Sequence, residues 1–362
     1  MPKEFDYTTV EQQIKILRDK GLLFDDEMLA KKRLERYGYY NIINSYKEPY
    51  QYINNGKKEY ISKTTFEQIY SMFTLDHNLR NSIMASMLDL EACLRSAAAE
   101  VISYSFGTDH NSYLNFRNYR DRFSKNPKFT LNGILGALHT NANSDKDPIK
   151  YYREKHQIVP PWILLKGTYF SVLINYIKCF KNEQKQHIIR ILLHISPDEP
   201  ITDEIVSLFQ NILFVCLDYR NTAAHGGRIY NFESSHIANI KISEELIRIF
   251  PVLEDASESS GIGLLIILLS VFKYKQPRTI ILNSLNNQLT RHLNLYPDDM
   301  NILSNSIKIP IQIQEYVWIN EKTRTYHINE HCSGMINAKR ISSNDIIALD
   351  YQPCKRCIRD IT

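Results

Sequence analysis

Residues 64–107 read "TTFEQIYSMFTLDHNLRNSIMASMLDLEACLRSAAAEVISYSFG", with no proline and with a glycine only at the last position. Apolar side chains such as Phe73 and Leu90 recur with the 3.6-residue period of an α-helix. Thr64 and Glu67 have the spacing of a capping box, and the final glycine is typical of a helix end. The stretch predicts one long helix in an all-α fold.

The same helical period continues on both sides of this stretch. It appears in "TTVEQQIKILRDKGL" (8–22), "PPWILLKGTYFSVLINYIKCF" (160–180) and "TDEIVSLFQNILFVCLDYRNTAAHGG" (202–227). From residue 314 onward, β-branched and aromatic residues, as in "YVWINEKTRTY", predict short strands. We therefore predict a helical domain at 1–250, a helical connector at 251–313 and a small α/β module at 314–362.

The composition is that of an ordinary globular protein, with 362 residues, 43% hydrophobic and 23% charged. The net charge of +4 permits contacts with nucleic acid without imposing a strong basic field. The segment "MPKEFDYTTVEQQ" has no apolar h-region, so we expect no secretory signal, and the most apolar run, at 262–272, is too short to span a bilayer. We expect a cytoplasmic protein with no membrane partner. The chain has no glycine-rich phosphate loop, G-x-S-x-G or H-E-x-x-H motif.

One segment, "LDYRNTAAHGGRIYN" (217–231), places three polar side chains near an expected helix end. RNA cleavage without a metal needs proton transfer and stabilisation of a charged phosphorane. His225 could transfer protons, Arg220 could fork onto phosphate oxygens, and Asn221 could orient the phosphate or the attacking hydroxyl. The alternative is structural: Gly226 ends the helix, and His225 interacts with the helix dipole.

The spacing of this motif has a geometric consequence. Residues five positions apart on an α-helix are rotated by about 140°, so Arg220 and His225 would not share a face. Either the helix distorts toward Gly226, or a second subunit completes the site. The second option predicts a homodimer.

Several of these segments occur in the order seen in the Abi family of bacterial abortive-infection proteins, which the chain resembles over roughly its first 235 residues. The likeness is to the AbiD/AbiF-like group. It is carried by "TTVEQQIKILRDKGL", "RLERYGYYNIINSYKEPY", "FEQIYSMFTLDHNLRNSIMASMLDLEACLRS", "PPWILLKGTYFSVLINYI" and "LDYRNTAAHGGRIYN". The family is assigned to the HEPN superfamily, an all-helical fold associated with metal-independent RNA cleavage. Two copies of its R-x(4–6)-H motif commonly meet at a dimer interface.

The resemblance implies an HEPN-like helical bundle and an anti-phage endoribonuclease whose catalytic residues are Arg220, Asn221 and His225. The "DLEACLR" segment corresponds to an earlier acidic and basic helix of the family, which implies that Glu91 and Arg95 support the site. A plain intrahelical ion pair is the alternative for these two residues.

The resemblance also bears on partners. AbiF-like proteins are similar to type VI CRISPR nucleases, and some are paired with a small non-coding RNA, so the likeness implies a cognate RNA that restrains the protein. HEPN folds also include non-catalytic RNA-binding proteins, which is the alternative function.

Three cysteines gather near the C-terminus, where Cys354 and Cys357 form a C-x-x-C knuckle and Cys332 precedes them. In a cytoplasmic chain this clustering favours a structural Zn²⁺ site over disulfides. The fourth ligand is His327 or His331. We prefer His327, because "YH-x4-C … PC-x2-C" resembles a small zinc-binding module appended to various nucleases and surface proteins. The alternative is a reduced or redox-active pair without a metal, although no βαβ pattern surrounds it.

Overall fold

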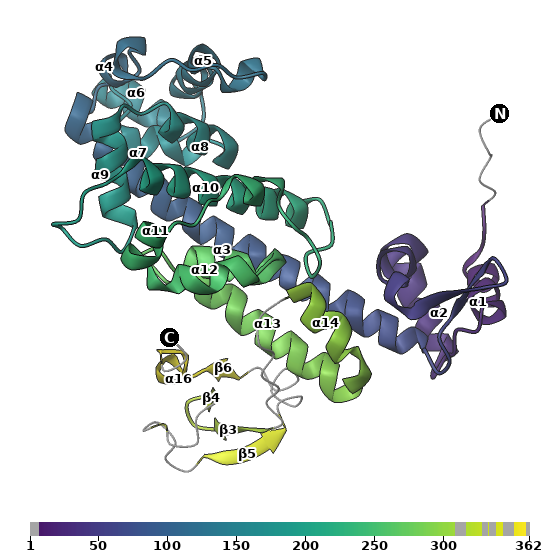
Figure 1. The fold of residues 1–362 in the computed structure, drawn as a ribbon. Helices are drawn as coiled ribbons and strands as arrows, with labels where there is room; N and C mark the ends of the chain where they lie inside the picture. Colours follow the sequence, from purple (N-terminus) through teal and green to yellow (C-terminus); the bar gives the residue numbers. More distant parts are fainter. Residues whose placement is uncertain (1–6, 308–315, 328–331, 333–337, 343–350, 360–362) are drawn as a thin grey trace. The chain divides into compact units, whose positions relative to one another are not determined.

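A computed structural model describes residues 7–307, 316–327, 332, 338–342 and 351–359 of the chain. It is mostly helical, with a small sheet near the C-terminus, as predicted (Figure 1). The chain forms two compact units: residues 1–81 with 283–362, and residues 82–282. The three-part division at 250 and 313 stays a prediction, although residues 251–307 are largely helical as expected.

The unit of residues 1–81 and 283–362 begins with two α-helices, a short π-helix (η1), a 3₁₀ helix (η2) and a hairpin. Its first elements are α1 (Val10–Asp19), α2 (Glu27–Tyr37), η1 (Tyr40–Asn44), η2 (Glu48–Tyr50), β1 (Gln51–Asn54) and β2 (Lys57–Tyr60). The strands pair antiparallel across a two-residue turn at Asn55 and Gly56, whose φ angles are 47° and 78°. Positive φ at both positions is what a type I′ turn needs, and Asn-Gly supplies it. This hairpin corrects the prediction that the first 250 residues are all helix.

Helix α3 (Phe66–Phe106) starts in this unit and ends in the other, and it is the long helix that the sequence predicted. Its cap lies one residue later than expected, since Thr65 Oγ1 accepts the backbone N–H of Gln68 at 3.1 Å. The carboxylate of Glu67 instead accepts the backbone N–H of Asp25 at 3.1 Å. Thr64 and Thr65 are adjacent in the sequence, so the capping pattern alone does not show which of them caps the helix.

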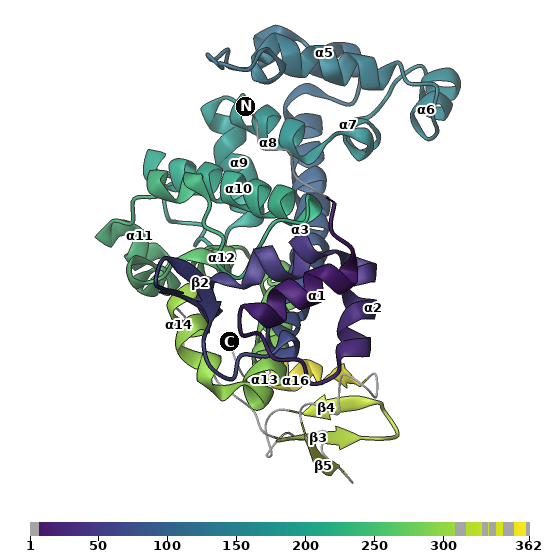
Figure 2. The ribbon, with the colours of Figure 1, turned by 90° about the vertical axis from the view of Figure 1, so that its right-hand side faces the viewer.

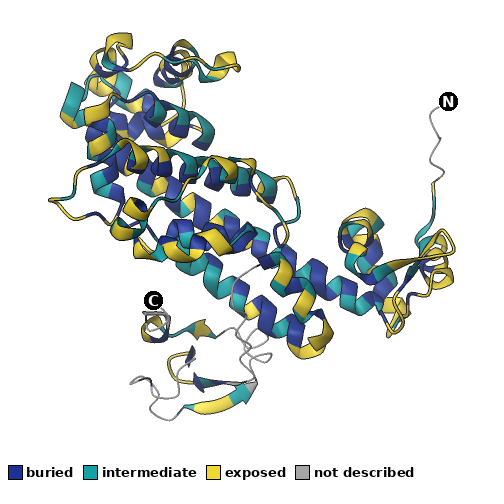
Figure 3. Ribbon diagram, viewed as in Figure 1, coloured by how far each residue is buried: buried dark blue, intermediate teal, exposed yellow. Residues whose placement is uncertain are grey.

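The second unit, residues 82–282, consists of helices that bury their apolar faces against one another (Figure 3). Its α-helices after α3 are α4 (His110–Tyr113), α5 (Leu131–Ala142), α6 (Ile149–His156), α7 (Pro161–Leu164), α8 (Phe170–Lys178), α9 (Asn182–Leu192), α10 (Asp203–Ala224), α11 (Glu244–Ile249) and α12 (Gly261–Leu269). Its 3₁₀ helices are η3 (Phe116–Asn118), η4 (Pro127–Phe129), η5 (Leu165–Gly167), η6 (Ser235–Asn239) and η7 (Pro251–Glu258). The apolar residues that recur at the helical period of α10 face inward, because Ile205, Ile212 and Tyr219 are each fully buried. Helix α10 is thus held by packing up to the turn that carries Arg220.

The remaining elements return to the first unit. They are α13 (Gln276–Leu295), which starts in the second unit, then η8 (Pro297–Asp299), α14 (Met300–Ile307), β3 (Tyr316–Asn320), β4 (Thr325–His327), β5 (Lys339–Ser342), β6 (Gln352–Pro353) and α16 (Lys355–Arg359). The strands form a sheet in the order β5-β3-β4-β6, with β6 parallel to β4 and the other pairs antiparallel. Figure 2 shows β3 between β4 and β5. Val317, Ile319 and Tyr326 form its small buried core. The short strands predicted from residue 314 are confirmed.

A buried polar network ties α3 to the segment 292–299. The imidazole of His292 lies 2.8 Å from Asp299 Oδ2 through Nε2 and 2.9 Å from Ser71 Oγ through Nδ1. Tyr50 and Gln68 also donate to the Asp299 carboxylate, at 2.6 and 2.9 Å. These partners satisfy a carboxylate that is 2% exposed.

We expect His292→Ala to lower the free energy of unfolding by about 3 kcal/mol, because it removes one partner of a buried hydrogen-bond network and leaves a cavity. Urea denaturation followed by circular dichroism measures the change. His139→Ala, at an exposed histidine on α5, is the control and should cost less than about 0.5 kcal/mol. Equal midpoints for the two variants would contradict the prediction.

Candidate functional site

The C-terminal end of α10 carries the Arg–His motif. The helix runs to Ala224, and His225 is its C-cap residue. Gly226, at φ +73°, donates its N–H to Ala223 O at 3.2 Å, and Gly227 donates to Thr222 O at 2.8 Å. These two bonds form a Schellman motif, which needs the left-handed backbone that glycine adopts. The predicted glycine end of the helix is confirmed.

The segment after the helix is tied back to α10 by side chains. Tyr219 donates its hydroxyl proton to Phe232 O at 2.9 Å, and Ser234 donates to Asp218 Oδ2 at 2.6 Å. The rings of Tyr219 and Phe232 also meet edge to face, 4.9 Å apart. The motif therefore lies on a rigid helix end and not in a loose loop.

Arg220 and His225 differ in their surroundings. The guanidinium of Arg220 is half-buried, and its Nη1 donates to Asn221 Oδ1 at 3.2 Å, while its buried Nε has no partner. The side chain of His225 is exposed and has no hydrogen bond or ion pair within the described part of the chain. Arg220 lies within the helix, and His225 follows it as the C-cap residue with φ −92° and ψ 9°. Positions five apart on a regular helix are about 140° apart around its axis.

Glu91 and Arg95, the predicted supporting pair, lie on the part of α3 that belongs to the same unit. Arg95 Nη2 lies 2.5 Å from Glu91 Oε1 and also donates to Thr168 O at 3.0 Å. Glu91 is 4% exposed, and burial raises its pKa, while the positive charges of Arg95 and Arg220 act in the opposite direction. The intrahelical ion pair is therefore present, and Glu91 also feels the charge of Arg220 from another helix. The Thr168 contact had no signal in the sequence.

The C-terminal module brings His327, Cys332, Cys354 and Cys357 together. Their candidate ligand atoms all lie within 4.8 Å of one another. Cys332 Sγ is 3.8 Å from Cys354 Sγ, and Cys357 Sγ is 3.7 Å from His327 Nδ1. Tetrahedral Zn²⁺ with Zn–S bonds of about 2.3 Å places its sulfurs about 3.8 Å apart. His331, the alternative ligand, lies outside the described residues.

The protonation of these groups also suits a metal. Burial lowers the pKa of His327, which favours the neutral imidazole that binds metals. Burial opposes ionisation of Cys354, but the backbone N–H groups of Cys357 and Arg356 outweigh it and lower the pKa of the thiol. Cys354 N–H also bonds to Tyr326 O at 2.8 Å, which fixes the knuckle to β4. The three cysteines and the histidine fit a Zn²⁺ ion.

The geometry defines a helical protein with an R-x₄-H motif at a capped helix end and a separate cluster of metal-binding type. The model of the Abi-like protein family matches residues 32–231, more than half of the chain. The chain belongs to the Abi-like protein family. The match includes Glu91, Arg95, Arg220, Asn221 and His225, and it ends before the metal-binding cluster.

Other comparisons add nothing to this assignment. No curated protein and no solved structure gives a significant match to the chain. Among the helices of the described residues, none combines the length and the apolar character needed to cross a membrane.

Proposed function

We propose that the protein is a metal-independent endoribonuclease of an abortive-infection system against phage, with an HEPN-type helical domain that acts as a homodimer. The observation that carries the proposal is the end of α10. There Arg220 has a buried Nε and His225 an exposed imidazole, and neither has a partner among the residues that the structure describes. Both stand at the capped end of a helix that the Abi-like match includes.

The reaction that suits these groups is attack of an RNA 2′-hydroxyl on the adjacent phosphorus. The 2′-O–P bond forms and the P–O5′ bond breaks, leaving a 2′,3′-cyclic phosphate and a 5′-hydroxyl. His225 takes the proton from the 2′-hydroxyl or delivers one to the departing 5′-oxygen. Arg220 stabilises the charged phosphorane, and Asn221 positions the phosphate.

A second copy of the chain would supply the second proton-transfer group that a single copy lacks at this motif. Proton uptake and proton delivery need two groups, and one chain provides one His225 at this motif. Arg220 and His225 are also five positions apart, which corresponds to about 140° around a regular helix. Two α10 ends related by a twofold axis would supply two imidazoles and two guanidiniums to one RNA strand. The buried carboxylate of Glu91, paired with Arg95, would help to keep Arg220 in place by its negative charge.

The remaining parts have supporting roles in this proposal. Zinc bound by His327, Cys332, Cys354 and Cys357 holds the C-terminal module together and takes no part in the cleavage. RNA is the substrate, and a small non-coding RNA restrains the enzyme until infection. A non-cleaving RNA-binding protein is the second candidate, favoured by the separation of Arg220 from His225 within one chain.

The test is cleavage of RNA by the purified protein in excess EDTA, with the zinc content measured afterwards so that loss of the structural ion is recognised. We expect products with 5′-hydroxyl and 2′,3′-cyclic phosphate ends. Cleavage that needs added Mg²⁺ would contradict the proposed chemistry. Salt-sensitive RNA binding without cleavage, in protein that retains its zinc, would favour the second candidate.

A further inference from the structure

Two segments of the second unit gather positive charge. Residues 117–122 read "RNYRDR" and residues 178–185 read "KCFKNEQK". They lie side by side, because Arg120 N–H bonds to Cys179 O at 2.8 Å and Lys181 Nζ donates to Arg117 O at 2.7 Å. Together they hold six cations and two carboxylates, a net charge of +4, which equals the formal net charge of the whole chain.

The charge of this basic surface is poorly compensated. Burial lowers the pKa of Lys178, and the charge of Arg122 adds to the effect. Burial together with Arg120 and Arg122 likewise lowers the pKa of Lys185, while Cys179 and Asp203 act in the opposite direction. None of the six cations forms an ion pair with a carboxylate of the described residues. A bound anion would relieve their mutual repulsion.

Exposed aromatic rings border the basic surface. Phe123 directly follows the first segment and is 84% exposed. Tyr104, at 80% exposure, lies edge-on to His187 of α9, 5.3 Å between ring centres. Cations that follow a phosphate backbone, combined with rings on which bases stack, are the features that bind single-stranded nucleic acid without sequence preference.

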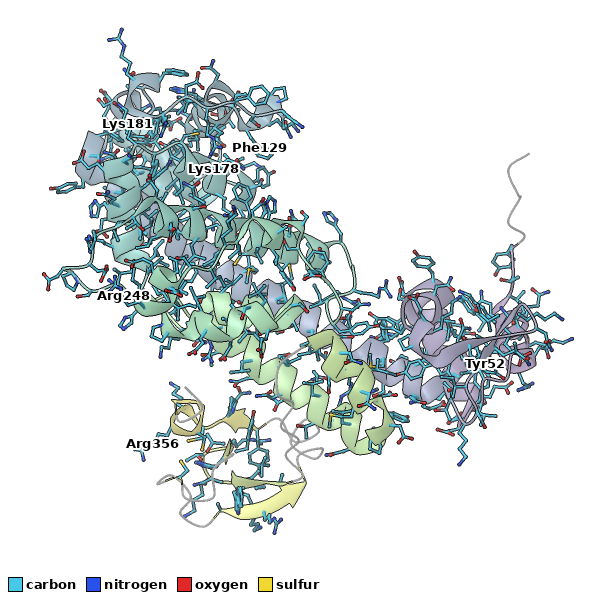
Figure 4. The ribbon with its side chains drawn as sticks, viewed as in Figure 1. Tyr52, Phe129, Lys178, Lys181, Arg248 and Arg356 are labelled. Atoms are coloured by element: carbon cyan, nitrogen blue, oxygen red, sulfur yellow. The ribbon has the colours of Figure 1, made fainter. Side chains whose placement is uncertain are left out.

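The surface is also connected to the candidate site through α10. Lys178, labelled in Figure 4, places its Nζ 4.6 Å from the centre of the Phe214 ring on α10. Asn221 and His225 follow Phe214 by seven and eleven residues, which are close to whole turns, so all three lie on one face of the helix. Along the axis they are roughly 10 and 16 Å from Phe214.

We propose that residues 117–123 and 178–185 form a binding surface for the backbone of single-stranded RNA and direct the strand along α10 toward His225. The inference rests on the proposed function for its choice of RNA as the partner. It goes further by naming a surface away from the Arg–His motif and a substrate that is single-stranded.

The test compares two triple variants in a His225→Ala background, so that the RNA stays intact. One is Arg120→Gln, Lys181→Gln, Lys185→Gln on the surface. Its control, Lys146→Gln, Lys150→Gln, Lys155→Gln, removes three cations in and beside α6 of the same unit. Fluorescence anisotropy with an unstructured RNA of about 20 nucleotides gives Kd at several salt concentrations, after thermal melting has shown that both variants fold.

We expect the surface variant to bind about tenfold more weakly or worse, and its plot of log affinity against log salt to lose about 2 from its slope, as three fewer phosphate contacts predict. The control should bind as the parent does. Unchanged affinity in the surface variant, or an equal loss in both, would overturn the proposal.

The aromatic border is tested separately by Phe123→Ala. This variant should bind the single strand about tenfold more weakly with the salt slope unchanged, because stacking is lost and no phosphate contact is. Unchanged affinity would show that Phe123 is not part of the RNA-binding surface. A cleavage assay of the chain with His225 intact separates the two proposals. If RNA binds through this surface but is never cut, only the proposed endoribonuclease activity is contradicted. If RNA is cut but the surface variant binds it as the parent does, only this inference is contradicted.

Discussion

His225→Ala should reduce the rate of RNA cleavage by about 10³-fold while RNA affinity stays within about twofold. The imidazole is exposed and has no side-chain partner in the described residues, so its removal leaves the Schellman end of α10 intact. In the proposed homodimer the substitution removes both proton-transfer groups at once. Single-turnover cleavage with protein in excess measures the chemical step free of product release.

His156→Ala, at another exposed histidine near a helix end, is the matched control and should cleave at the parent rate. Arg220→Lys refines the result, because lysine keeps the charge but loses the planar fork that contacts two phosphate oxygens. We expect the Arg220→Lys variant to cleave RNA at least tenfold more slowly than the parent. Cleavage by His225→Ala at the parent rate would place the chemistry outside this motif.

The sequence predicted the local features of this site. Helical periodicity, a glycine pair and an R-x₄-H spacing all act within one helix, so α10, its buried face and its end could be located without coordinates. The metal-binding cluster was predicted for a similar reason, since a C-x-x-C knuckle restricts two of its ligands by spacing alone. The turn between β1 and β2 also has a local signal in the sequence, because an Asn-Gly dipeptide favours a two-residue hairpin turn.

Contacts between distant segments could not be predicted in this way. The charge of Arg220 acts on Glu91 although the two residues lie on different helices far apart in the sequence, and no spacing in a single sequence encodes that. The basic surface likewise arises where two segments, 117–122 and 178–185, meet through backbone and side-chain bonds. Each segment by itself is an ordinary group of charges on a solvated surface. Only their juxtaposition leaves Lys178 and Lys185 half-buried among arginines.

The second large effect concerns the metal-binding cluster. We expect one zinc per chain, and we expect Cys354→Ser to lose it, because a hydroxyl at that position cannot replace a thiolate ligand. Binding of a structural zinc contributes on the order of 10 kcal/mol to folding in small zinc domains, far more than the buried core of Val317, Ile319 and Tyr326 can replace. Metal analysis measures the loss of zinc, and hydrogen exchange over residues 316–327 measures the loss of folded structure in β3 and β4.

The helices provide the internal reference for this experiment. Cys93→Ser on α3 changes a cysteine outside the cluster and should keep both its zinc and its slow exchange in β3 and β4. In Cys354→Ser the sheet should exchange rapidly while α10 remains protected, since the helical unit has its own buried core. Full zinc content in Cys354→Ser would contradict the ligand assignment. Comparison of His327→Ala with His331→Ala then identifies the fourth ligand, because only the true ligand, which we assign to His327, lowers zinc affinity when removed.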